Sequence, residues 1–451
     1  MPKASDIRVV EAEVSFEPCQ FRSPLKFGGR TMEHSTLINV QVSVETRGKK
    51  HAAVGFGSMP AGNIWAWPSS EVSPDQTEQA MLDFAQEVVD IATSFDTFEH
   101  PLDVVYDLSG EYEHLGKVVA KNLGLNEPMP KLAALVAASP LDAAIHDAYG
   151  RLHQQNSYNL LSKQYMNRDL SEYLDKDFAG EYLDKYTLRE PTPKLALYHL
   201  VGALDALTPA EITKPLKDGV PESLDAWIAA EGLTHFKIKL NGDDLAWDVN
   251  RVLAVEQVVT EAQKKKNVTT WQYSLDFNEK CANVDYVLDF LKQVQAKSPA
   301  AYDRVQYIEQ PTNRDLKASA DNKMHAAAKL KPVVIDESLV DYDALLTARE
   351  LGYSGVALKA CKGHSEALFA AAAAQKFGMF LCVQDLTCPG AAFMHSASLA
   401  ARVPGITGIE GNARQYCPSA NKVLARTFPG MFQIKDGTVN TSVLTADGLG
   451  W

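Results

Sequence analysis

Charged residues stand at the ends of five successive apolar runs in this 451-residue chain. The runs and their charged residues are HFKIKL with Lys237 and Lys239, WQYSLDF with Asp276, VQYIEQ with Glu309, PVVID with Asp336 and GVALK with Lys359. Three carboxylates brought to one point repel each other, and a hard divalent cation with oxygen ligands removes that conflict. The order Lys, Asp, Glu, Asp, Lys therefore predicts a metal site flanked by two bases.

Eight short apolar runs between residues 195 and 411 must position these side chains. They alternate with amphipathic stretches, such as 245–265 and 365–377, that have the periodicity and length of crossover helices. This alternation is typical of a parallel (β/α)8 barrel of the TIM type. Because polar side chains from different strands converge at the C-terminal end of such a barrel, all five charged positions are predicted to meet there.

The rest of the chain divides into three parts. Residues 1–150 begin with the alternating segments IRVVEAEVSF and STLINVQVSVET and continue with helical patterns, one of which is predicted to start at Ser139-Pro140. This part is expected to be an α+β domain. Residues 151–194 are polar and rich in tyrosine, which indicates an insertion or linker, and the barrel follows over 195–415. The turn-rich tail, 416–451, is expected to return to the first domain.

The composition excludes several classes of partner. With 57 acidic and 44 basic residues the net charge is −13, so neither nucleic acid nor an anionic membrane is an expected partner. The first residues show no secretory signal, and the longest apolar tract is interrupted by Gln375 and Lys376. Six cysteines show neither a CxxC pair nor zinc spacing, which indicates packed, reduced thiols. A cytoplasmic protein is expected.

The spacing of the charged residues suggests which of them act as bases and which bind the metal. Lys237 and Lys239 are two apart on one strand, so both face the same side, and Lys237, as a second cation, is expected to lower the pKa of Lys239 from its reference of about 10.4. Lys359 lies across an eight-stranded ring from them. Asp336 and Glu337 point to opposite sides of a strand, so only Asp336 is expected to bind the metal. Mg²⁺ is the predicted ion, with Mn²⁺ as the alternative.

Such an arrangement suits removal of a proton next to a carboxylate, with the metal stabilising the enediolate. The motifs together resemble the enolase superfamily, in particular the mandelate racemase/muconate lactonizing enzyme family and its muconate-lactonizing subgroup. The matching pieces are KIK at 237–239, DFNE at 276–279, IEQP at 308–311, DES at 336–338 and LKACKG at 358–363. The resemblance covers nearly the whole chain and implies a capping domain built from the N-terminal part and the C-terminal tail.

The resemblance also implies a role for each matching residue. Lys239 and Lys359 would be the acid/base pair, and Lys237 would tune Lys239 and polarise the substrate carboxylate. The metal ligands would be Asp276, Glu309 and Asp336. Residues expected to contact these groups or the substrate are Asn278, Glu337, Asp385, Glu410 and Trp65. For Glu410 a structural role at the barrel rim is the alternative, and for Trp65 the alternative is packing of the cap against the barrel.

Two capping loops, 23–34 and 55–68, would close over the substrate, and Gly28 and Gly29 would give the first its mobility. The chain departs from the family after the sixth run, where Gly363-His364 replaces a glycine pair. His364 either contacts substrate or lies in a solvated loop, and we expect the loop. The seventh run ends in Gln384-Asp385 instead of histidine, which disfavours dehydration of acid sugars by a His–Asp pair. His395 is expected to be packed in a helix.

The predicted function is Mg²⁺-dependent abstraction of the α-proton of a small carboxylate substrate, with racemisation or epimerisation by two lysines. A cycloisomerase or a dehydratase/lyase that uses the same enolate is the alternative. A catalytically silent binding or scaffold barrel is a third hypothesis, although no ligand or lysine is missing. We expect a homo-oligomer. The sequence does not name the substrate, because loop shape decides specificity.

Overall fold

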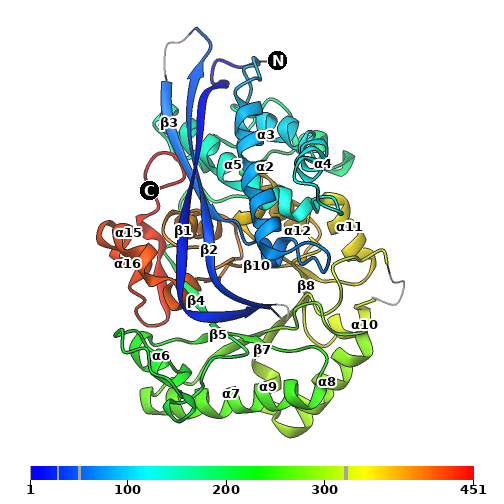
Figure 1. Ribbon diagram of the computed structural model, residues 1–451, viewed down its shortest axis with the longest axis vertical. Helices are drawn as coiled ribbons and strands as arrows, with labels where there is room; N and C mark the ends of the chain where they lie inside the picture. The colour runs from blue at the N-terminus through cyan, green and yellow to red at the C-terminus, as the bar shows by residue number, and fades with distance from the viewer. Residues whose placement is uncertain (1, 28–29, 49–51, 319–322) are drawn as a thin grey trace.

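The structure has two parts, a parallel barrel and a smaller α+β part packed against it (Figure 1). It is a computed structural model that describes residues 2–27, 30–48, 52–318 and 323–451. Gly28 and Gly29 lie outside these residues, so the predicted loop mobility concerns a segment that the structure does not describe. The two parts form the modified TIM barrel with a capping domain that the motifs predict.

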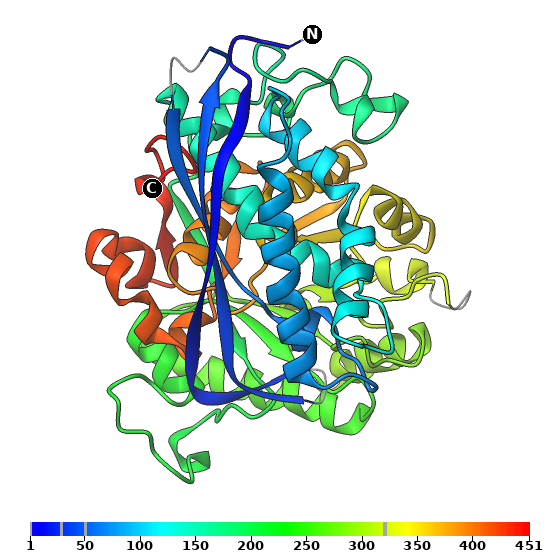
Figure 2. The same cartoon turned by 45° about the horizontal axis from the view of Figure 1, so that its top comes forward.

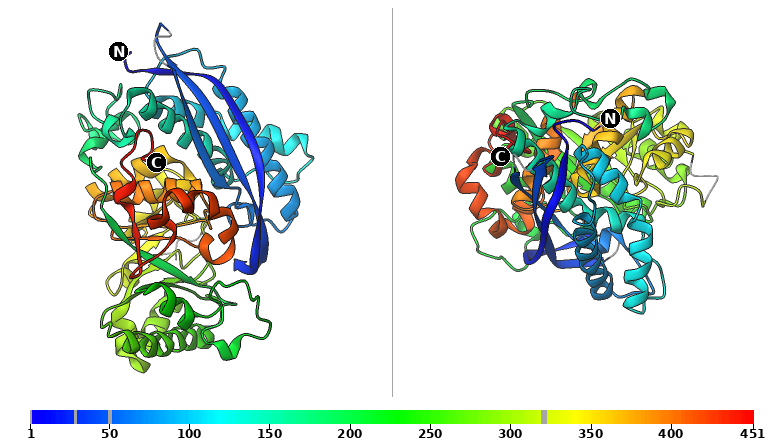
Figure 3. Two further views of the ribbon diagram at one scale, coloured as in Figure 1. Left: turned by 90° about the vertical axis from the view of Figure 1, so that its left-hand side faces the viewer. Right: turned by 90° about the horizontal axis from the view of Figure 1, so that it is seen from above.

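The capping domain is a three-stranded antiparallel sheet with helices packed against it. Its strands pair in sequence order: β1 (Ile7–Phe27), β2 (Arg30–Thr46) and β3 (Ala52–Pro60). Its helices are α1 (Asn63–Ala66), α2 (Pro74–Ala92), α3 (Pro101–Ser109), α4 (Tyr112–Asn122) and α5 (Lys131–His153). The long strands β1 and β2 extend past the helices toward the barrel (Figure 3), where Phe21 and Leu25 share an apolar cluster with Leu200 and Tyr416.

Helix α5 corrects one expectation, because Ser139-Pro140 lies inside the helix and does not start it. A proline has no N–H to donate, so its position in a helix costs a hydrogen bond. The strand β3 lies close against the helix at this point: a side chain on Gly57 would come within 1.8 Å of the Pro140 carbonyl oxygen. The helix is buried along nearly its whole length, and this tertiary packing outweighs the unfavourable proline.

Eight parallel strands close the barrel, and the first and last of them are paired. Each overlaps one of the predicted apolar runs: β4 (Lys194–Val201), β5 (His235–Lys239), β6 (Gln272–Asp276), β7 (Val305–Glu309), β8 (Val333–Ile335), β9 (Gly355–Leu358), β10 (Phe380–Val383) and β11 (Gly408–Glu410). Side chains fill the interior below the strand ends, among them Tyr198, Tyr307, Val334, Ala357 and Cys382. The barrel is therefore a packed core with its polar groups at one end.

The barrel helices surround the strands. They are α6 (Leu224–Glu231), α7 (Leu245–Lys266), α8 (Val284–Lys297), α9 (Pro299–Arg304), α10 (His325–Ala328), α11 (Tyr342–Glu350), α12 (His364–Lys376) and α13 (Ala391–Arg402). Helix α7 shows how the sequence sets their ends. The Asp244 side chain accepts a hydrogen bond from the backbone of Trp247, and Asn267 ends the helix in a left-handed conformation.

The segment 151–194 forms four short 3₁₀ turns, η1 (Ser157–Leu160), η2 (Leu170–Glu172), η3 (Lys176–Phe178) and η4 (Leu183–Lys185). Asn156, Asp169 and Asp175 start the first three turns, and each side chain accepts from a backbone N–H two residues later. The segment runs along the outside of the molecule, beside the barrel helices (Figure 2). The Tyr173 ring stacks on Phe369 of α12, with centroids 4.7 Å apart.

The tail contains α14 (Ala413–Tyr416), η7 (Pro418–Asn421), α15 (Lys422–Thr427), α16 (Pro429–Phe432), β12 (Thr438–Asn440) and η8 (Thr441–Val443). Strand β12 pairs with β4 of the barrel, while Leu449 donates its N–H to Asp147 of α5 in the cap. All six cysteines are free and buried. Within the described residues, every helix is too short or too polar to cross a membrane.

Candidate active site

Five consecutive barrel strands carry the predicted site residues at their C-terminal ends. Lys239, Asp276 and Glu309 are direct neighbours in register across β5, β6 and β7. Asp336 follows β8, and Lys359 follows β9. All five residues are at most 3% exposed. Because β5 and β9 are four strands apart in a closed ring of eight, the two lysines enter the site from opposite sides.

The two lysines of β5 neutralise carboxylates on other strands. Lys237 Nζ lies 2.8 Å from Glu309 Oε1, 2.9 Å from Glu410 Oε1 and 3.1 Å from Asp276 Oδ2. Lys239 Nζ forms a second ion pair with Asp276 Oδ2. The structure thus brings both ammonium groups to the carboxylates, as the spacing of two residues predicts. Glu410 contributes a fourth acid to this network.

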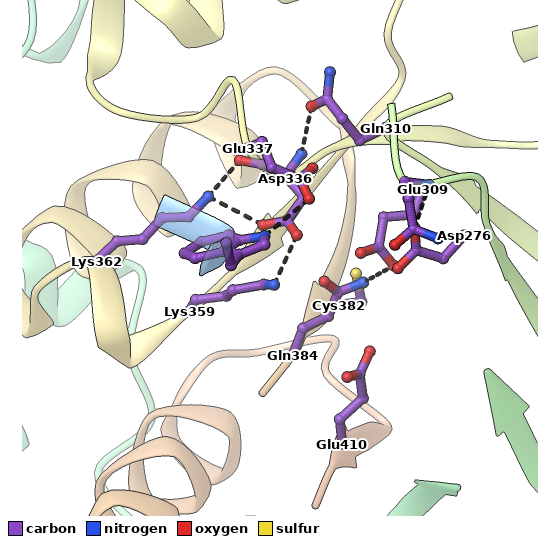
Figure 4. A network of polar contacts seen from close by, with 12 residues as sticks. Asp276, Glu309, Gln310, Asp336, Glu337, Lys359, Lys362, Cys382, Gln384 and Glu410 are labelled. Carbon is purple, nitrogen blue, oxygen red and sulfur yellow. Dashed lines mark hydrogen bonds and ion pairs between the residues drawn. The ribbon is translucent and has the colours of Figure 1, made fainter. Parts of the chain in front are cut away.

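Asp336 is held by two lysines, of which the motifs revealed only one. Lys359 Nζ lies 2.7 Å from Asp336 Oδ2. Lys362 Nζ lies 3.1 Å from Asp336 Oδ1 and also donates to the backbone carbonyl of the same residue (Figure 4). The 3₁₀ turn η6 (Ala360–Lys362) returns Lys362 to the side of Lys359, because such a turn repeats every three residues. The spacing of the two lysines in LKACKG was the available signal.

Burial and neighbouring charges act in opposite directions on the three predicted metal ligands. Burial raises the pKa of Asp276, but Lys239 and Lys237 lower it further, and the net result is a pKa below the ordinary range. The pKa of Asp336 is lowered in the same way, by Lys359 and Lys362. Burial and the charge of Asp276 instead raise the pKa of Glu309 well above its ordinary value, and Lys237 offsets only part of this.

The carboxylates in turn raise the pKa of two lysines of the site. Burial lowers the pKa of Lys237, but the carboxylates of Glu309, Glu410 and Asp276 raise it by more. For Lys359 burial is likewise outweighed, mainly by Asp336. In the structure these carboxylates therefore keep Lys237 and Lys359 protonated, whereas a base must be neutral before it accepts a proton.

The three carboxylates fit a hard divalent cation in chemistry and in strand position. They supply only oxygen ligands, and the raised pKa of Glu309 reports a repulsion that such a cation would relieve. Their present spacing is different: among the described residues, no three Asp, Glu, His or Cys side chains are grouped so that they could hold a metal ion. In the structure Lys239 pairs with Asp276, and Lys359 and Lys362 pair with Asp336, so ammonium groups engage these carboxylates.

Trp65 of α1 connects the capping domain to this network. Its Nε1 donates to Glu337 Oε1 at 2.8 Å, and its ring centroid lies 4.4 Å from Lys359 Nζ and 5.5 Å from Lys362 Nζ. Burial, with contributions from Asp336 and Glu279, raises the pKa of Glu337 to about 8. Trp65 thus packs the cap against the barrel and also lies over the ammonium groups, an arrangement that favours cations.

The remaining predicted residues form hydrogen bonds with side chains of the network or with the loops beside it. Asn278 accepts a hydrogen bond from Lys239 at 3.0 Å, and its backbone has a positive φ of 50°. Asp385 accepts backbone N–H groups of Cys388 and Asn412, both at 2.6 Å, and burial raises its pKa to about 6. Gln384, which the sequence did not mark as a site residue, donates to Glu309 (Figure 4).

The space in front of the lysines is small. A cavity of about 20 Å³ is lined by Lys237, Lys239 and Lys359 together with Leu25 and Met32 of the cap. This volume is sufficient for about one water molecule. A carboxylate substrate therefore cannot enter unless the cap side chains move away from the strand ends.

Of the two histidines considered, one lies where it was expected and the other does not. His364 is buried, so the expected solvated loop is wrong. The start of α12 packs against α5 here, and the rings of His364 and His146 lie 4.7 Å apart. Burial lowers the pKa of His364 to about 3. His395 is buried in α13, as expected.

Comparison with protein-family models gives one match, the enolase C-terminal domain-like family, over residues 220–451. This range includes all predicted lysines and metal ligands and excludes most of the capping domain. No protein in a curated collection matches the sequence.

Several solved structures share the fold across nearly the whole chain. The L-Ala-D/L-Glu epimerase from Bacillus subtilis is 17% identical, with 98% of each chain covered and a TM-score of 0.63. A dipeptide epimerase from Enterococcus faecalis is 17% identical, with 98% of this chain and 99% of the other covered and a TM-score of 0.62. A muconate lactonizing enzyme from Pseudomonas fluorescens is 16% identical, with 98% and 96% covered and a TM-score of 0.58. At these identities the likeness shows the fold alone.

Proposed function

Because the chain belongs to the enolase C-terminal domain-like family, we propose that it removes the α-proton of a small carboxylate substrate and returns a proton to the opposite face. This reaction racemises or epimerises the α-carbon. The observation that carries the proposal is the position of Lys239 and Lys359 on opposite sides of one buried barrel mouth. A carbon held between them can lose a proton to one amine and gain a proton from the other.

The predicted acids complete this assignment. Asp276, Glu309 and Asp336 would hold Mg²⁺, with Mn²⁺ as the alternative ion. When bound, the ion supplies a Lewis acid for the negative charge that develops on the substrate carboxylate. The fold neighbour from Enterococcus faecalis was solved with Mg and the dipeptide L-Leu-L-Tyr, which supports both the ion and the substrate class.

The other residues would position the two bases. Asn278 accepts from Lys239 and holds its ammonium group beside Asp276. Trp65 covers Lys359 and keeps water from that side of the site. Lys237, which touches three carboxylates, is placed to hold their charge in balance and to polarise a substrate carboxylate. Each base must leave its carboxylate partner before it accepts a proton.

The test is proton exchange with solvent. The protein would be incubated with Mg²⁺ in D₂O against pooled chiral carboxylates, including acyl amino acids, dipeptides, hydroxy acids and sugar acids. α-Deuterium uptake would be followed by mass spectrometry and optical purity by chiral chromatography. We expect deuterium uptake with loss of optical purity. Lys239→Ala and Lys359→Ala should each lower racemisation by about 10²–10⁴-fold, because each removes one proton-transfer group.

The control is Lys117→Ala, which removes an exposed lysine of α4 that pairs with Glu113 and should leave the rate unchanged. Loss of water from the substrate would assign the chain to the lyases, and ring closure or opening without α-exchange at both faces would assign it to the cycloisomerases. Racemisation at the parent rate in both lysine variants would overturn the two-base assignment. A protein that binds no Mg²⁺ by calorimetry and exchanges no proton would be a silent scaffold.

A further inference from the structure

A second and much larger cavity lies beside the barrel mouth, between the capping helices and the barrel helices. Its volume is about 450 Å³, within the range of small-molecule sites. The walls come from α3 and α5 of the cap, from the residues that follow η2 in the 151–194 segment, and from α11 and α12 of the barrel. Lys359 and Lys362 form part of its lining. This cavity gives the 151–194 segment, which has no role in the proposed reaction, a part in building a site.

One wall of the cavity is aromatic. Tyr106 of α3 meets Tyr173 edge to face, with centroids 5.3 Å apart and an interplanar angle of 79°. Tyr173 in turn stacks on Phe369 of α12, at 4.7 Å and 22°. All three rings line the cavity. Three elements that are distant in sequence thus bring aromatic rings to one wall of the cavity. Such rings favour the binding of apolar groups and of organic cations.

Among the described residues, the charged groups of the cavity are paired except for Glu366 and the exposed Asp343. Lys131 Nζ pairs with Asp341 Oδ2 at 2.6 Å, and Lys359 and Lys362 both pair with Asp336. Within the described part of the chain, Glu366 of α12 accepts no hydrogen bond and belongs to no ion pair, although it lines the cavity and is partly buried. A carboxylate withdrawn from water without a partner is unfavourable unless a ligand supplies the missing charge.

We propose that this cavity binds a small organic ammonium compound. The ammonium group pairs with Glu366, and its apolar or aromatic body lies against Tyr173 and Phe369. The cavity adjoins the barrel mouth at Lys359, which lines both spaces, but its lining contains neither Lys237 nor Lys239, and the binding of an ammonium compound does not rest on the proton-transfer proposal. Since burial raises the pKa of Glu366 to about 7, binding should strengthen as the carboxyl ionises.

The neighbours of Glu366 decide how clear this pH dependence is. Lys131 lowers the pKa of Glu366, whereas Asp142 of α5 and Asp341 raise it. All three side chains remain beside Glu366 when the ligand binds. Between pH 6 and pH 8 a carboxyl with a pKa of about 7 goes from mostly protonated to mostly ionised, a change of about tenfold in the ionised fraction. Benzylammonium keeps its charge over this range, so the change in its affinity reports the ionisation of Glu366 and, near pH 6, of its neighbour Asp142, whose pKa burial raises to about 6.

The experiment measures binding of benzylammonium by calorimetry to the full chain, with benzyl alcohol as the neutral analogue. At pH 8 we expect saturable binding that Glu366→Gln weakens by about tenfold or more, because a charge-assisted hydrogen bond is lost. Tyr173→Leu should weaken it as well. The matched control is Glu350→Gln on the exposed side of the adjacent helix α11, which should change the affinity less than twofold. Benzyl alcohol should bind at least about tenfold more weakly and be indifferent to Glu366→Gln.

Thermal unfolding followed by circular dichroism establishes that each variant is folded. If Glu366→Gln does not fold, the parent protein alone still decides, because its affinity for benzylammonium should rise about tenfold from pH 6 to pH 8. Absence of saturable binding, equal binding of benzyl alcohol, or an affinity that is the same in Glu366→Gln and at both pH values would overturn the proposal.

Discussion

The barrel mouth and the contact between α5 and α12 both bury titratable side chains, but Asp276 and Asp336 at the first are ionised, whereas the histidines at the second are neutral. At the mouth, lysines and carboxylates lie within ion-pair distance of each other, and the pKa of Asp276 and Asp336 falls. At the second contact burial lowers the pKa of His364 to about 3, and it does the same for His395 of α13, so both imidazoles are uncharged near neutral pH. The depth of burial is the same in both regions, and the difference lies in the partners.

The neutral region contains a serine, a histidine and an aspartate, but it lacks the order of a nucleophilic triad. Ser365 Oγ donates to Asp142 Oδ1 at 2.9 Å, and His146 Nε2 contacts the same hydroxyl at 3.0 Å. In a triad the histidine lies between the other two and takes the proton of the serine. Here the aspartate binds the serine directly and all three are buried. The cluster therefore joins the cap to the barrel, while the mouth carries the proposed chemistry.

The largest expected effect comes from breaking the balance of charge at the mouth. Lys237→Met removes one cation that touches Glu309, Glu410 and Asp276. Removing one partner of a buried ion pair costs about 3–5 kcal/mol, because the remaining charge is uncompensated. We expect a markedly lower midpoint in urea and in thermal unfolding. Added Mg²⁺ should restore part of the loss if the carboxylates bind it.

Lys117→Met is the reference for this substitution, since the exposed pair with Glu113 is solvated and its loss should be hard to detect. If Lys237→Met unfolds at the parent midpoint, Glu309 must take up a proton when the lysine is lost. The raised pKa of Glu309 makes that outcome informative, because the mouth would then behave like the neutral histidine region.

A second prediction concerns acid sensitivity of the histidine region. The unfolded imidazole has a pKa of about 6.5 and binds a proton as the pH falls, whereas the folded imidazole of His395, with a pKa of about 3, does not. Protons therefore favour the unfolded state below about pH 6.5, and stability falls as pH falls. By linkage each such ring costs about 2 kcal/mol at pH 5. His395→Phe should remove that share and raise the unfolding midpoint at pH 5.

Within the described residues neither ring nitrogen of His395 has a hydrogen-bond partner, and its ring packs against Trp451. Phenylalanine should therefore be tolerated at pH 8, where the variant and the parent are expected to unfold alike. Arg151, and His364 when it is protonated, lower the pKa of His395 further. Asp142 changes the stability in the opposite direction. Burial raises its pKa to about 6, so the folded state takes up this proton more readily than the unfolded state as the pH falls. Identical pH profiles for His395→Phe and the parent would contradict a buried neutral ring.

The barrel and the five charged strand ends were predictable because their signals are local. Each strand is a short apolar run, and parallel strands place their C-terminal residues at one end of a barrel whatever the other contacts are. The family and the eight strands are confirmed by the family match and the closed sheet. The roles of Lys239, Lys359 and the three carboxylates stay predictions, since their geometry shows proximity and not reaction.

The failures have a common cause, which is contact between the cap and the barrel. Pro140 lies within a helix because β3 and the barrel bury that helix, and His364 is buried because α5 covers the start of α12. Neither contact leaves a periodic signal in the sequence, since the partners are more than two hundred residues apart for His364 and His146. Lys362 was missed for another reason: its position depends on a 3₁₀ turn that only the folded chain reveals.

Trp65 lies where the cap meets the charged mouth. Its substitution is the prediction with the smallest expected effect on stability. Trp65→Phe removes the hydrogen bond from Nε1 to Glu337, a buried carboxyl whose other oxygen has no partner among the described residues. We expect a loss of about 1–2 kcal/mol, since water cannot replace the donor. Trp67→Phe is the matched control, because Trp67 Nε1 donates to Glu127, which is only half-buried and can turn to water.

If both substitutions lower the unfolding midpoint equally, Glu337 must gain a donor from elsewhere, most simply by keeping a proton of its own. Its pKa of about 8 allows this, and the mouth would then hold a neutral acid beside the ionised Asp336.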